Sequence, residues 1–557
     1  MKLHAHPKPH PALDVPVAEA RHERAGLDKV VFGVTAAIAI LFLIWGFVST
    51  DSLASVSGKS LAWTMANTGW LFVLTSSGFV VFVLWLALSR FGNIPLGRDD
   101  EEPEFRTVSW IAMMFSAGMG IGLMFYGVSE PVSHFVNPPP GTGDPGNPQA
   151  VQNAMATTLF HWTLHPWAIY AVVGLAISYG VYRKGRMQLI SSAFEPLIGS
   201  RANGPWGKVI DMLAIFATLF GSAASLGLGA LQIRSGLQIV TGLSATGNGV
   251  LIAIITILTV AFVISAVTGV EKGIQWLSNI NMVLAVVLAS FVFLVGPTVF
   301  ILNLIPTSLG SYLQDLALMA ARTGAEGGGT NDWLSSWTVF YWAWWLSWTP
   351  FVGMFIARIS RGRTIRQFVS GVLLVPSLVS LVWFCVFGGA AIRLQQTGTD
   401  IEGAGDLPSQ LFTTLQAYPF ATAASVLVMV LVAIFFVSGA DAASIVMGSL
   451  SERGTLHPSR PTVVFWGVAT GAVAAVMLLV GGQDALSGLQ TITIVAALPF
   501  VLVMIGLAVA LVKDLRTDPL MVRQQYAAEA MENAVIAGVT EHGDDFVISV
   551  DRDPAAD

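Results

Sequence analysis

The chain has 557 residues, of which 54% are hydrophobic and only 11% are charged. Soluble proteins carry about 25% charged residues, so this composition excludes a soluble protein and indicates a polytopic membrane protein. The formal net charge of −6 is spread over loops and tails, which gives no indication of a nucleic-acid partner. Cys385 is the only cysteine, which excludes a disulfide framework and a thiolate metal site.

Apolar runs long enough to cross the hydrocarbon core of a bilayer, roughly 30 Å, recur twelve times. They lie near residues 30–49, 68–89, 107–129, 151–181, 208–236, 248–269, 276–304, 334–357, 367–392, 419–450, 462–482 and 488–512. If the number of spans is even and the chain starts in the cytoplasm, most Lys and Arg residues of the short loops lie on the cytoplasmic side of the membrane. The outer loops carry only Lys59, Arg234, Arg322 and Arg393. By the positive-inside rule, we expect both termini in the cytoplasm.

The span near 107–129 contains FSAGMGIGLMFYG, in which Gly118, Gly120 and Gly122 are spaced by two. Each glycine lowers helix propensity by about 1 kcal/mol, so this segment favours local unwinding. Unwound backbone inside a membrane faces protein or a water-filled cavity, where its amides bind anionic groups and ions. The same spacing also permits close helix packing, and the glycines alone leave both interpretations open.

The span near 151–181 contains FHWTLHPWAIY. Trp162, Trp167 and Tyr170 share one face of a helix that Pro166 loosens, so we expect two indoles and a phenol to point inward together.

Two histidines in the same segment, His161 and His165, have the spacing of paired zinc ligands. The sequence lacks the glutamate of the H-E-x-x-H motif, and it offers no obvious third ligand. We therefore expect these histidines to pack within the bundle rather than to bind a metal.

Polar residues also interrupt two later spans. Thr218, Ser222 and Ser225 form one stripe on the span near 208–236, where their hydroxyls either ligate a hard cation or bond back to the helix backbone. Asp441 lies in FFVSGADAAS, inside a long apolar run. A carboxylate is costly at that depth, so Asp441 is expected to face the interior of the bundle.

Six tryptophans lie between Trp333 and Trp348, in WLSSWTVFYWAWWLSW. Indole faces attract cations by about 0.5 to 2 kcal/mol per contact, and several rings around one quaternary ammonium make a selective pocket. An aromatic belt at the lipid headgroups is the alternative interpretation. Together with the inward rings of the 151–181 span, the cluster favours a cage for a cation.

The sequence has no P-loop, nucleophile elbow or dinucleotide fingerprint. We therefore expect neither an enzyme nor a cofactor. Residues 1–29 are polar and do not resemble a cleavable signal peptide. Residues 513–557 are acidic, and we expect this tail to be solvated and partly disordered.

Four segments together resemble the signature segments of the betaine/choline/carnitine transporter family. They are GMGIGLMFYG at 118–127, FHWTLHPWAIY at 160–170, FYWAWWLSWTPF at 340–351 and ARISRGRT at 357–364. The resemblance extends from about residue 27 to residue 515. Within the family it is closest to the sodium-coupled glycine betaine symporters.

This resemblance implies an all-α polytopic membrane protein with twelve transmembrane helices and the amino-acid-transporter-like fold. Its implied parts are two preliminary helices at 30–89, an inverted five-helix repeat at 107–304, an amphipathic linker at 305–333 and a second inverted repeat at 334–512. The tails at 1–29 and 513–557 are then cytoplasmic. The resemblance also implies a homotrimer in the plasma (inner) membrane.

Carried over residue by residue, the resemblance assigns a quaternary ammonium cage to Trp162, Trp167, Tyr170 and Trp345. It places Trp344, Trp348 and Phe351 along the route to the cytoplasm. The carboxylate of the solute is expected to meet backbone amides of Gly118, Met119, Gly120 and Gly122. Choline carriers of the family tend to have an aspartate at the position of Gly122, so a zwitterion fits this chain better than choline.

Two sodium sites are implied in the same way. One resembles Thr218 and Ser222 with the ring of Phe351 close by, and the other resembles the carbonyls of Ser116, Met119 and Phe435 with the hydroxyl of Ser438. The chain departs from the pattern at Gly439, where a second hydroxyl is expected, which puts the second site in question. Ser116 stands where alanine is usual, and its hydroxyl or a water is one way to restore the missing ligand.

Sodium-independent exchangers of the family carry a basic residue in the seventh span, where this chain has Asn279 and Asn281. The implied function is therefore sodium symport of glycine betaine or a similar zwitterionic compatible solute by alternating access. Two alternatives stay open. One is a sodium-independent or proton-coupled choline or carnitine transporter or exchanger, and the other is a membrane osmosensor that binds betaine without moving it.

Overall fold

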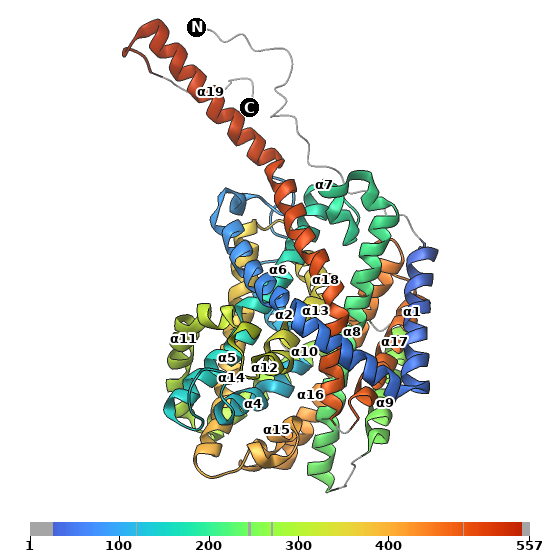
Figure 1. Ribbon diagram of the computed structural model, residues 1–557. Helices are drawn as coiled ribbons and strands as arrows, with labels where there is room; N and C mark the ends of the chain where they lie inside the picture. The colour runs from blue at the N-terminus through green and yellow to red at the C-terminus, as the bar shows by residue number, and fades with distance from the viewer. Residues whose placement is uncertain (1–25, 119, 243–246, 269–270, 483, 548–557) are drawn as a thin grey trace.

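The computed structural model describes residues 26–547 except 119, 243–246, 269–270 and 483. Within these residues the fold is helical, and a single antiparallel bridge between Pro95 and Thr364 is the only extended pairing. The long helices form one bundle around a continuous apolar core (Figure 1).

The helices of the first half of the chain lie between residues 29 and 295. They are α1 (Lys29–Val48), α2 (Thr50–Leu88), α3 (Thr107–Gly118), α4 (Ile121–Val136), α5 (Pro148–Trp162), α6 (Leu164–Ser178), α7 (Glu195–Ile198), α8 (Pro205–Thr241), α9 (Asn248–Thr268) and α10 (Glu271–Val295). Four short helical turns join them, namely η1 (Arg90–Asn93), η2 (Tyr179–Arg183), η3 (Ser191–Phe194) and η4 (Gly199–Asn203).

The second half repeats this pattern of long helices joined by short turns. Its helices are α11 (Thr298–Ala321), α12 (Thr330–Ser336), α13 (Thr338–Arg358), α14 (Ile365–Gln396), α15 (Leu407–Gln416), α16 (Ala421–Ser451), α17 (Arg460–Val480), α18 (Ala485–Arg516) and α19 (Pro519–His542). The turns η5 (Gly324–Glu326) and η6 (Glu402–Ala404) complete it.

Nine helices in the described part of the chain are long and apolar enough to cross a membrane, with α5 and α6 counted as one span. The count is ten if α10 and α11, which are bent by 110°, form one broken span. The chain is therefore a helical, multi-pass membrane protein. The expected number of twelve spans and the two inverted repeats stay predictions, because α3 and α4 are short and α13 is not apolar enough to qualify.

Three breaks between consecutive helices lie in the segments that carry the aromatic residues. The first lies in the 107–129 span, where α3 ends at Gly118 and α4 begins at Ile121 after the extended Gly120, in line with the local unwinding that is one of the two interpretations of these glycines. A second break at Thr163, with φ −117° and ψ −107°, separates α5 from α6. A third at Trp337, with φ −126° and ψ −89°, separates α12 from α13. Helix α13 packs against α6, α8 and α18, so it occupies the centre of the bundle.

The acidic tail differs from the expectation that it is partly disordered. Pro519–His542 form α19, which projects away from the bundle (Figure 1). Asp518 caps this helix by accepting a hydrogen bond of 2.8 Å from the amide of Leu520, and Pro519 occupies the first helical position. A capping carboxylate and a proline at that position both favour helix initiation, and the Ala-rich and Glu-rich residues that follow have high helix propensity.

Candidate functional site

The break between α5 and α6 positions the aromatic residues of this segment. Helix α5 ends at Trp162, and Pro166 lies in the first turn of α6, where its missing amide hydrogen costs no helical hydrogen bond. Trp162 and Trp167 therefore lie on either side of this break, and both indoles are buried.

The four predicted cage residues lie together around one small cavity of about 50 Å³. The ring centroids of Trp162 and Trp345 are 4.9 Å apart with an interplanar angle of 73°. Tyr170 lies 6.4 Å from Trp345 and 5.4 Å from Trp167, in each case edge to face. Rings from three helices thus surround the same space, which is the arrangement that attracts a quaternary ammonium.

Gly120 and Gly122 line the same cavity and supply its polar side. Gly120 is extended and precedes α4, so the first amides of α4 have no partner within the helix and carry a partial positive charge. A Cβ added to Gly122 would lie 2.6 Å from the Trp162 ring and 2.8 Å from the Trp344 ring. The packing of these indoles therefore requires glycine at position 122.

The tryptophan cluster divides between two environments. Trp344, Trp345 and Trp348 line the cage cavity, and Trp344 stacks on Trp345 at 4.5 Å. Trp342 lies in the core instead and stacks on His165 at 4.8 Å, with an interplanar angle of 16°. His165 thus packs as expected, and its Nε2 lies 3.3 Å from the hydroxyl of Ser77.

A second cavity of about 210 Å³ adjoins the first, because Gly120 and Trp348 line both. It brings together residues from both proposed sodium sets, namely Ser116, Ser222, Phe351, Phe435 and Ser438. Gly439 also lines it, and an added Cβ there would meet open space.

The hydroxyl groups near this cavity differ in whether they are free to bind an ion or already donate a hydrogen bond to the helix backbone. The Ser222 hydroxyl is buried without a hydrogen-bond partner among the described residues. Thr218 does not line the cavity and donates to the Ala214 carbonyl at 2.8 Å. The Ser438 hydroxyl donates to the Ile434 carbonyl at 2.9 Å. Met119 lies outside the described residues, so its roles at the substrate and sodium sites stay predictions.

Glu130 is a site residue that the sequence interpretation missed. It is fully buried in α4, and its Oε2 accepts hydrogen bonds from Trp162 Nε1 at 2.7 Å and from the Tyr341 hydroxyl. The carboxylate therefore fixes the indole of a cage residue. The signal that indicates such a residue is the one that singled out Asp441, an acidic side chain inside an apolar run.

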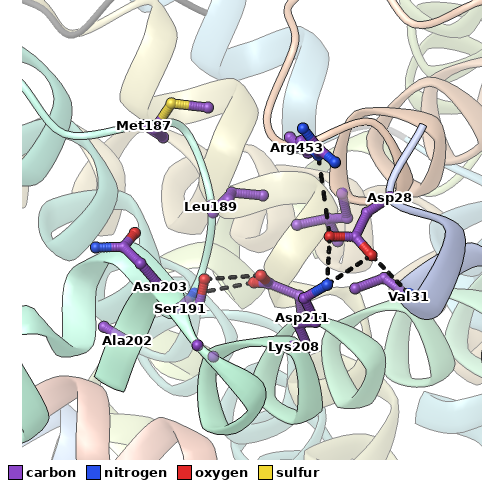
Figure 2. Close-up of a pocket in the computed structure, with 13 residues that line it drawn as sticks. Asp28, Val31, Met187, Leu189, Ser191, Ala202, Asn203, Lys208, Asp211 and Arg453 are labelled. Carbon is purple, nitrogen blue, oxygen red and sulfur yellow. Dashed lines mark hydrogen bonds and ion pairs between the residues drawn. The ribbon is translucent and has the colours of Figure 1, made fainter. Parts of the chain in front are cut away.

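A larger cavity, of about 610 Å³, lies where α1 and α8 begin (Figure 2). Its charged groups are already paired: Lys208 Nζ lies 2.9 Å and Arg453 Nε lies 4.0 Å from Asp28 Oδ2. Burial raises the pKa of Asp28, but hydrogen bonds from Lys208 and from the first amides of α1 outweigh it and hold the pKa below its ordinary value. Asp211 accepts hydrogen bonds from the amide and hydroxyl of Ser191. These contacts anchor α1, so we assign no substrate to this cavity.

Comparison with known proteins gives the family. Residues 30–520 match the family model described as the betaine/carnitine/choline family transporter. The betaine/ectoine transporter LcoP of Corynebacterium glutamicum is 48% identical over 547 residues, which cover 98% of this chain and 86% of that protein. The glycine betaine transporter OpuD of Bacillus subtilis is 46% identical, with 88% of this chain and 94% of that protein covered.

A third relative, glycine betaine transporter 1 of Vibrio parahaemolyticus, is 40% identical over 91% of this chain and 98% of its own length. The matches run through the α3–α4 break, the α5–α6 break and the aromatic helix α13, which carry the residues that line the small cavity. The chain is a transporter rather than an enzyme. It belongs to the betaine/carnitine/choline transporter family.

Proposed function

We propose that this protein imports glycine betaine or a similar zwitterionic compatible solute together with sodium, by alternating access across the plasma (inner) membrane with both termini in the cytoplasm. The observation that carries the proposal is the position of the aromatic cage beside the amino-terminal end of α4. Relatives named for betaine transport, at 40 to 48% identity, support the same class of solute.

The two sides of the cage cavity suit the two ends of a betaine. The rings of Trp162, Tyr170 and Trp345 attract its quaternary ammonium without requiring a hydrogen bond. The free amides at the start of α4 attract its carboxylate through hydrogen bonds and the helix dipole. Choline has no carboxylate, and Gly122 leaves no room for an acidic side chain that would neutralise its charge.

Sodium is the coupling ion that this arrangement favours. The second cavity gathers hydroxyl groups and an aromatic ring next to the cage, and Na⁺ is a hard cation that prefers oxygen ligands. The two cavities share Gly120 and Trp348, and this shared lining supports coupling between an ion bound in one cavity and solute bound in the other. The hydroxyl of Ser222, which has no hydrogen-bond partner in the described part of the chain, is the best placed of these ligands.

The number of ions decides how far the solute can be accumulated. Each sodium supplies about 1.4 kcal/mol per tenfold gradient and about 2.3 kcal/mol from a potential of 100 mV. One ion then supports accumulation of several hundred-fold, and two ions support about 10⁵-fold. We propose two ions, with the Ser116 hydroxyl serving the site that lacks a hydroxyl at Gly439.

Uptake into proteoliposomes tests this function directly. Radiolabelled glycine betaine is supplied under an inward sodium gradient and, separately, under an equal potassium gradient, with unlabelled choline, carnitine or ectoine as competitors. We expect sodium-dependent accumulation that betaine-like zwitterions reduce and choline does not. Ectoine is included because LcoP is named for both betaine and ectoine. Uptake without sodium contradicts the coupling, and binding without accumulation identifies an osmosensor instead.

A further inference from the structure

A cluster of ligating side chains lies directly behind the aromatic cage, outside the proposed substrate and sodium sites. Glu130 and His134 come from α4, and His161 comes from α5. One donor atom of each lies within 4.8 Å of the other two, and all three side chains are fully buried. The sequence favours packing for His161 and His165, and the cluster pairs His161 with Glu130 and His134 instead of with His165.

The carboxylate of Glu130 divides its two oxygens between the cage and this cluster. Oε2 accepts hydrogen bonds from Trp162 and Tyr341, which belong to the cage side. Oε1 faces the histidines, with His161 Nδ1 at 2.6 Å and His134 Nε2 at 3.5 Å. A ligand bound at Oε1 therefore does not compete with the hydrogen bond that positions the Trp162 indole.

His134 is the residue whose environment is incomplete. Both of its ring nitrogens are buried, and neither has a hydrogen-bond partner among the described residues. Its ring lies 4.6 Å from Trp337 and 5.7 Å from Trp333, so two indoles lie beside it. An unpaired nitrogen in a protein interior costs stability, yet Nε2 is directed at Glu130 Oε1. A group that bridges the two atoms removes that cost.

We propose that Glu130, His134 and His161 form a binding site for a first-row transition metal ion, with Zn²⁺ the best fit. Two imidazole nitrogens and one carboxylate oxygen are a donor set that proteins use for Zn²⁺, with a fourth position left open. Ligand atoms bound at about 2.1 Å in a tetrahedral arrangement are separated by about 3.4 Å. The separation of His134 Nε2 and Glu130 Oε1, 3.5 Å, matches that value.

His161 is already oriented for this role. Its Nδ1 lies 2.6 Å from Glu130 Oε1, so binding lengthens this contact by less than 1 Å and releases the proton that the pair shares. Its Nε2 lies 2.9 Å from the Thr338 hydroxyl. With a metal on Nδ1, the remaining hydrogen is on Nε2 and is donated to Thr338, which fixes the tautomer and the ring orientation.

Zinc retention by the purified full-length chain tests the site without reference to transport. His4, His6, His10 and His22 of the polar amino-terminal segment are replaced by alanine in the parent protein, because histidine side chains there could bind zinc independently of the cluster, and the affinity tag is free of histidine. The detergent-purified protein is incubated with ZnCl₂, desalted and analysed for bound metal and for melting temperature. We expect about one Zn²⁺ per chain and a higher melting temperature with zinc, since a ligand that binds only the folded state stabilises it.

The variant His134→Phe keeps an aromatic ring in place and removes a ligand. We expect retained zinc to fall at least tenfold in it, whereas the control His165→Phe keeps zinc at the parent level. A parent protein that retains no zinc, or equal retention in His134→Phe and the parent, overturns the proposal.

His134→Cys supplies a second test that does not depend on the aromatic substitution folding. A thiolate at this position restores a ligand, so the Co²⁺-loaded variant is expected to show a thiolate-to-cobalt absorption band that the parent lacks. The native thiol, Cys385, is present in both proteins and serves as the background. A folded His134→Cys variant without the new band contradicts metal binding at this cluster. Loss of betaine uptake alone does not bear on any of these measurements.

Discussion

Trp345 is the proposed cage residue on the central helix α13, and we expect its loss to lower solute affinity more than the loss of any other residue. Its ring faces Trp162 and stacks on Trp344, and its Nε1 donates to the His161 carbonyl at 3.1 Å. The substitution Trp345→Leu removes one aromatic face from a desolvated cation, a loss of about 2 kcal/mol. We expect the half-saturation concentration for betaine uptake to rise at least tenfold.

The control for this prediction is Trp342→Phe, which changes a tryptophan of the same helix that packs on His165 away from the cage. Its half-saturation concentration should stay close to that of the parent, even if its stability falls. Unchanged kinetics in Trp345→Leu would show that Trp345 is not part of the substrate site.

Substitution of Gly122 tests how tightly the indoles of Trp162 and Trp344 pack against it. Because an added Cβ would lie 2.6 Å from the Trp162 ring, Gly122→Ala has to displace that indole or the neighbouring Trp344 ring. We expect weaker betaine binding, measured by tryptophan fluorescence titration. Gly78→Ala in α2 is the matched control, because no atom lies within 4 Å of its added Cβ. Equal affinity in both variants would show that the indoles move without cost.

At the residue level, the sequence predicted which aromatic side chains line the cavity but not what holds them. The rings of Trp162, Tyr170 and Trp345 stand out because indole and phenol are rare among aliphatic residues, and family motifs contain them. Glu130 is one acidic residue in an apolar run, and its partners Trp162 and Tyr341 are 32 and 211 positions away. No local periodicity predicts contacts at such separations, because they depend on how α4, α5 and α13 pack.

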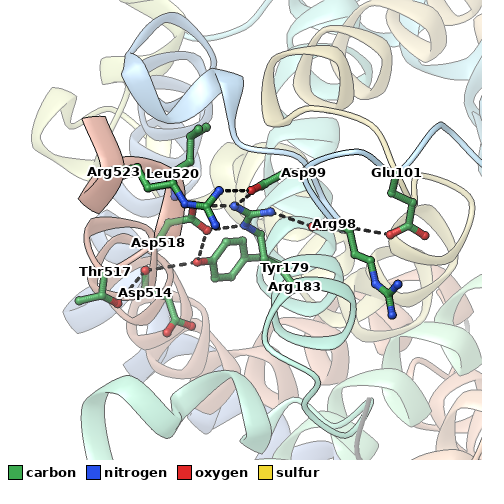
Figure 3. Close-up of polar contacts among 11 residues, drawn as sticks. Arg98, Asp99, Glu101, Tyr179, Arg183, Asp514, Thr517, Asp518, Leu520 and Arg523 are labelled. Carbon is green, nitrogen blue, oxygen red and sulfur yellow. Dashed lines mark hydrogen bonds and ion pairs between the residues drawn. The ribbon is translucent and has the colours of Figure 1, made fainter. Parts of the chain in front are cut away.

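The attachment of α19 is the clearest feature at the level of elements (Figure 3). Asp518, at the start of α19, accepts hydrogen bonds from Arg183 Nη2 and the Tyr179 hydroxyl, each at 2.8 Å. Arg183 also bonds the Gly97 carbonyl, and it pairs with Asp99 at 2.8 Å. One buried guanidinium, on the last residue of η2, thus joins that turn, the loop after η1 and the start of the carboxy-terminal helix.

The substitution Asp518→Ala should therefore be strongly destabilising. It leaves the buried charge of Arg183 without its main partner and removes the cap of α19. Breaking a buried pair in this way costs about 3 to 5 kcal/mol. Thermal unfolding in detergent, followed by intrinsic fluorescence, is expected to show a clear fall in melting temperature.

Arg523→Ala is the comparison within the same network. Arg523 pairs with Asp99 at 2.6 Å, but both side chains are about one-third exposed, so the expected loss is about 1 kcal/mol or less. Burial raises the pKa of Asp99, while hydrogen bonds and charge from Arg183 and Arg523 outweigh it and lower the pKa. Asp99 is therefore charged at neutral pH, and its contribution is lost only as the pH falls through that lowered pKa. A larger effect from Arg523→Ala than from Asp518→Ala would contradict this account.

Element boundaries were predictable where a residue type signals them. The glycines at 118–122 indicated either local unwinding or close helix packing, and a break is present before α4. Pro166 likewise signals the interruption at Thr163, three residues before it. The break at Trp337 carries no such signal, because tryptophan does not favour interruption of a helix. Helix α2 begins at Thr50, well before the expected 68, since its polar first turns lower the apolar signal without preventing a helix.

For the whole molecule, we predict a homotrimer, as the resemblance to the family implies. Native mass spectrometry or light scattering in mild detergent should give three times the 59.2 kDa mass of the chain. A mass of one chain across several detergents and protein concentrations would contradict this assembly.

The number of sodium ions coupled to each solute depends on the second proposed sodium site, and this number limits how far the transporter accumulates solute. Gly439 lines the second cavity, and no described atom lies within 4 Å of an added Cβ there, so Gly439→Ser fits and adds a hydroxyl to the residues that line this cavity. If the second sodium site lacks a strong ligand, the new hydroxyl strengthens it. We expect the half-saturation concentration for sodium to fall at least threefold, because a net gain of about 0.7 kcal/mol from one added ligand corresponds to that factor.

Ser116→Ala is the opposite test of the same site, because it removes the hydroxyl proposed to replace the missing one. Its sodium half-saturation concentration should rise, and the accumulation ratio at equal gradients should fall from about 10⁵ towards several hundred-fold, the limit for one ion. Gly310→Ser in α11 controls for the substitution, because its added Cβ also meets open space but does not line the cavity. If Gly439→Ser and Ser116→Ala both leave sodium dependence unchanged, only one ion is coupled and the second set of ligands has a structural role.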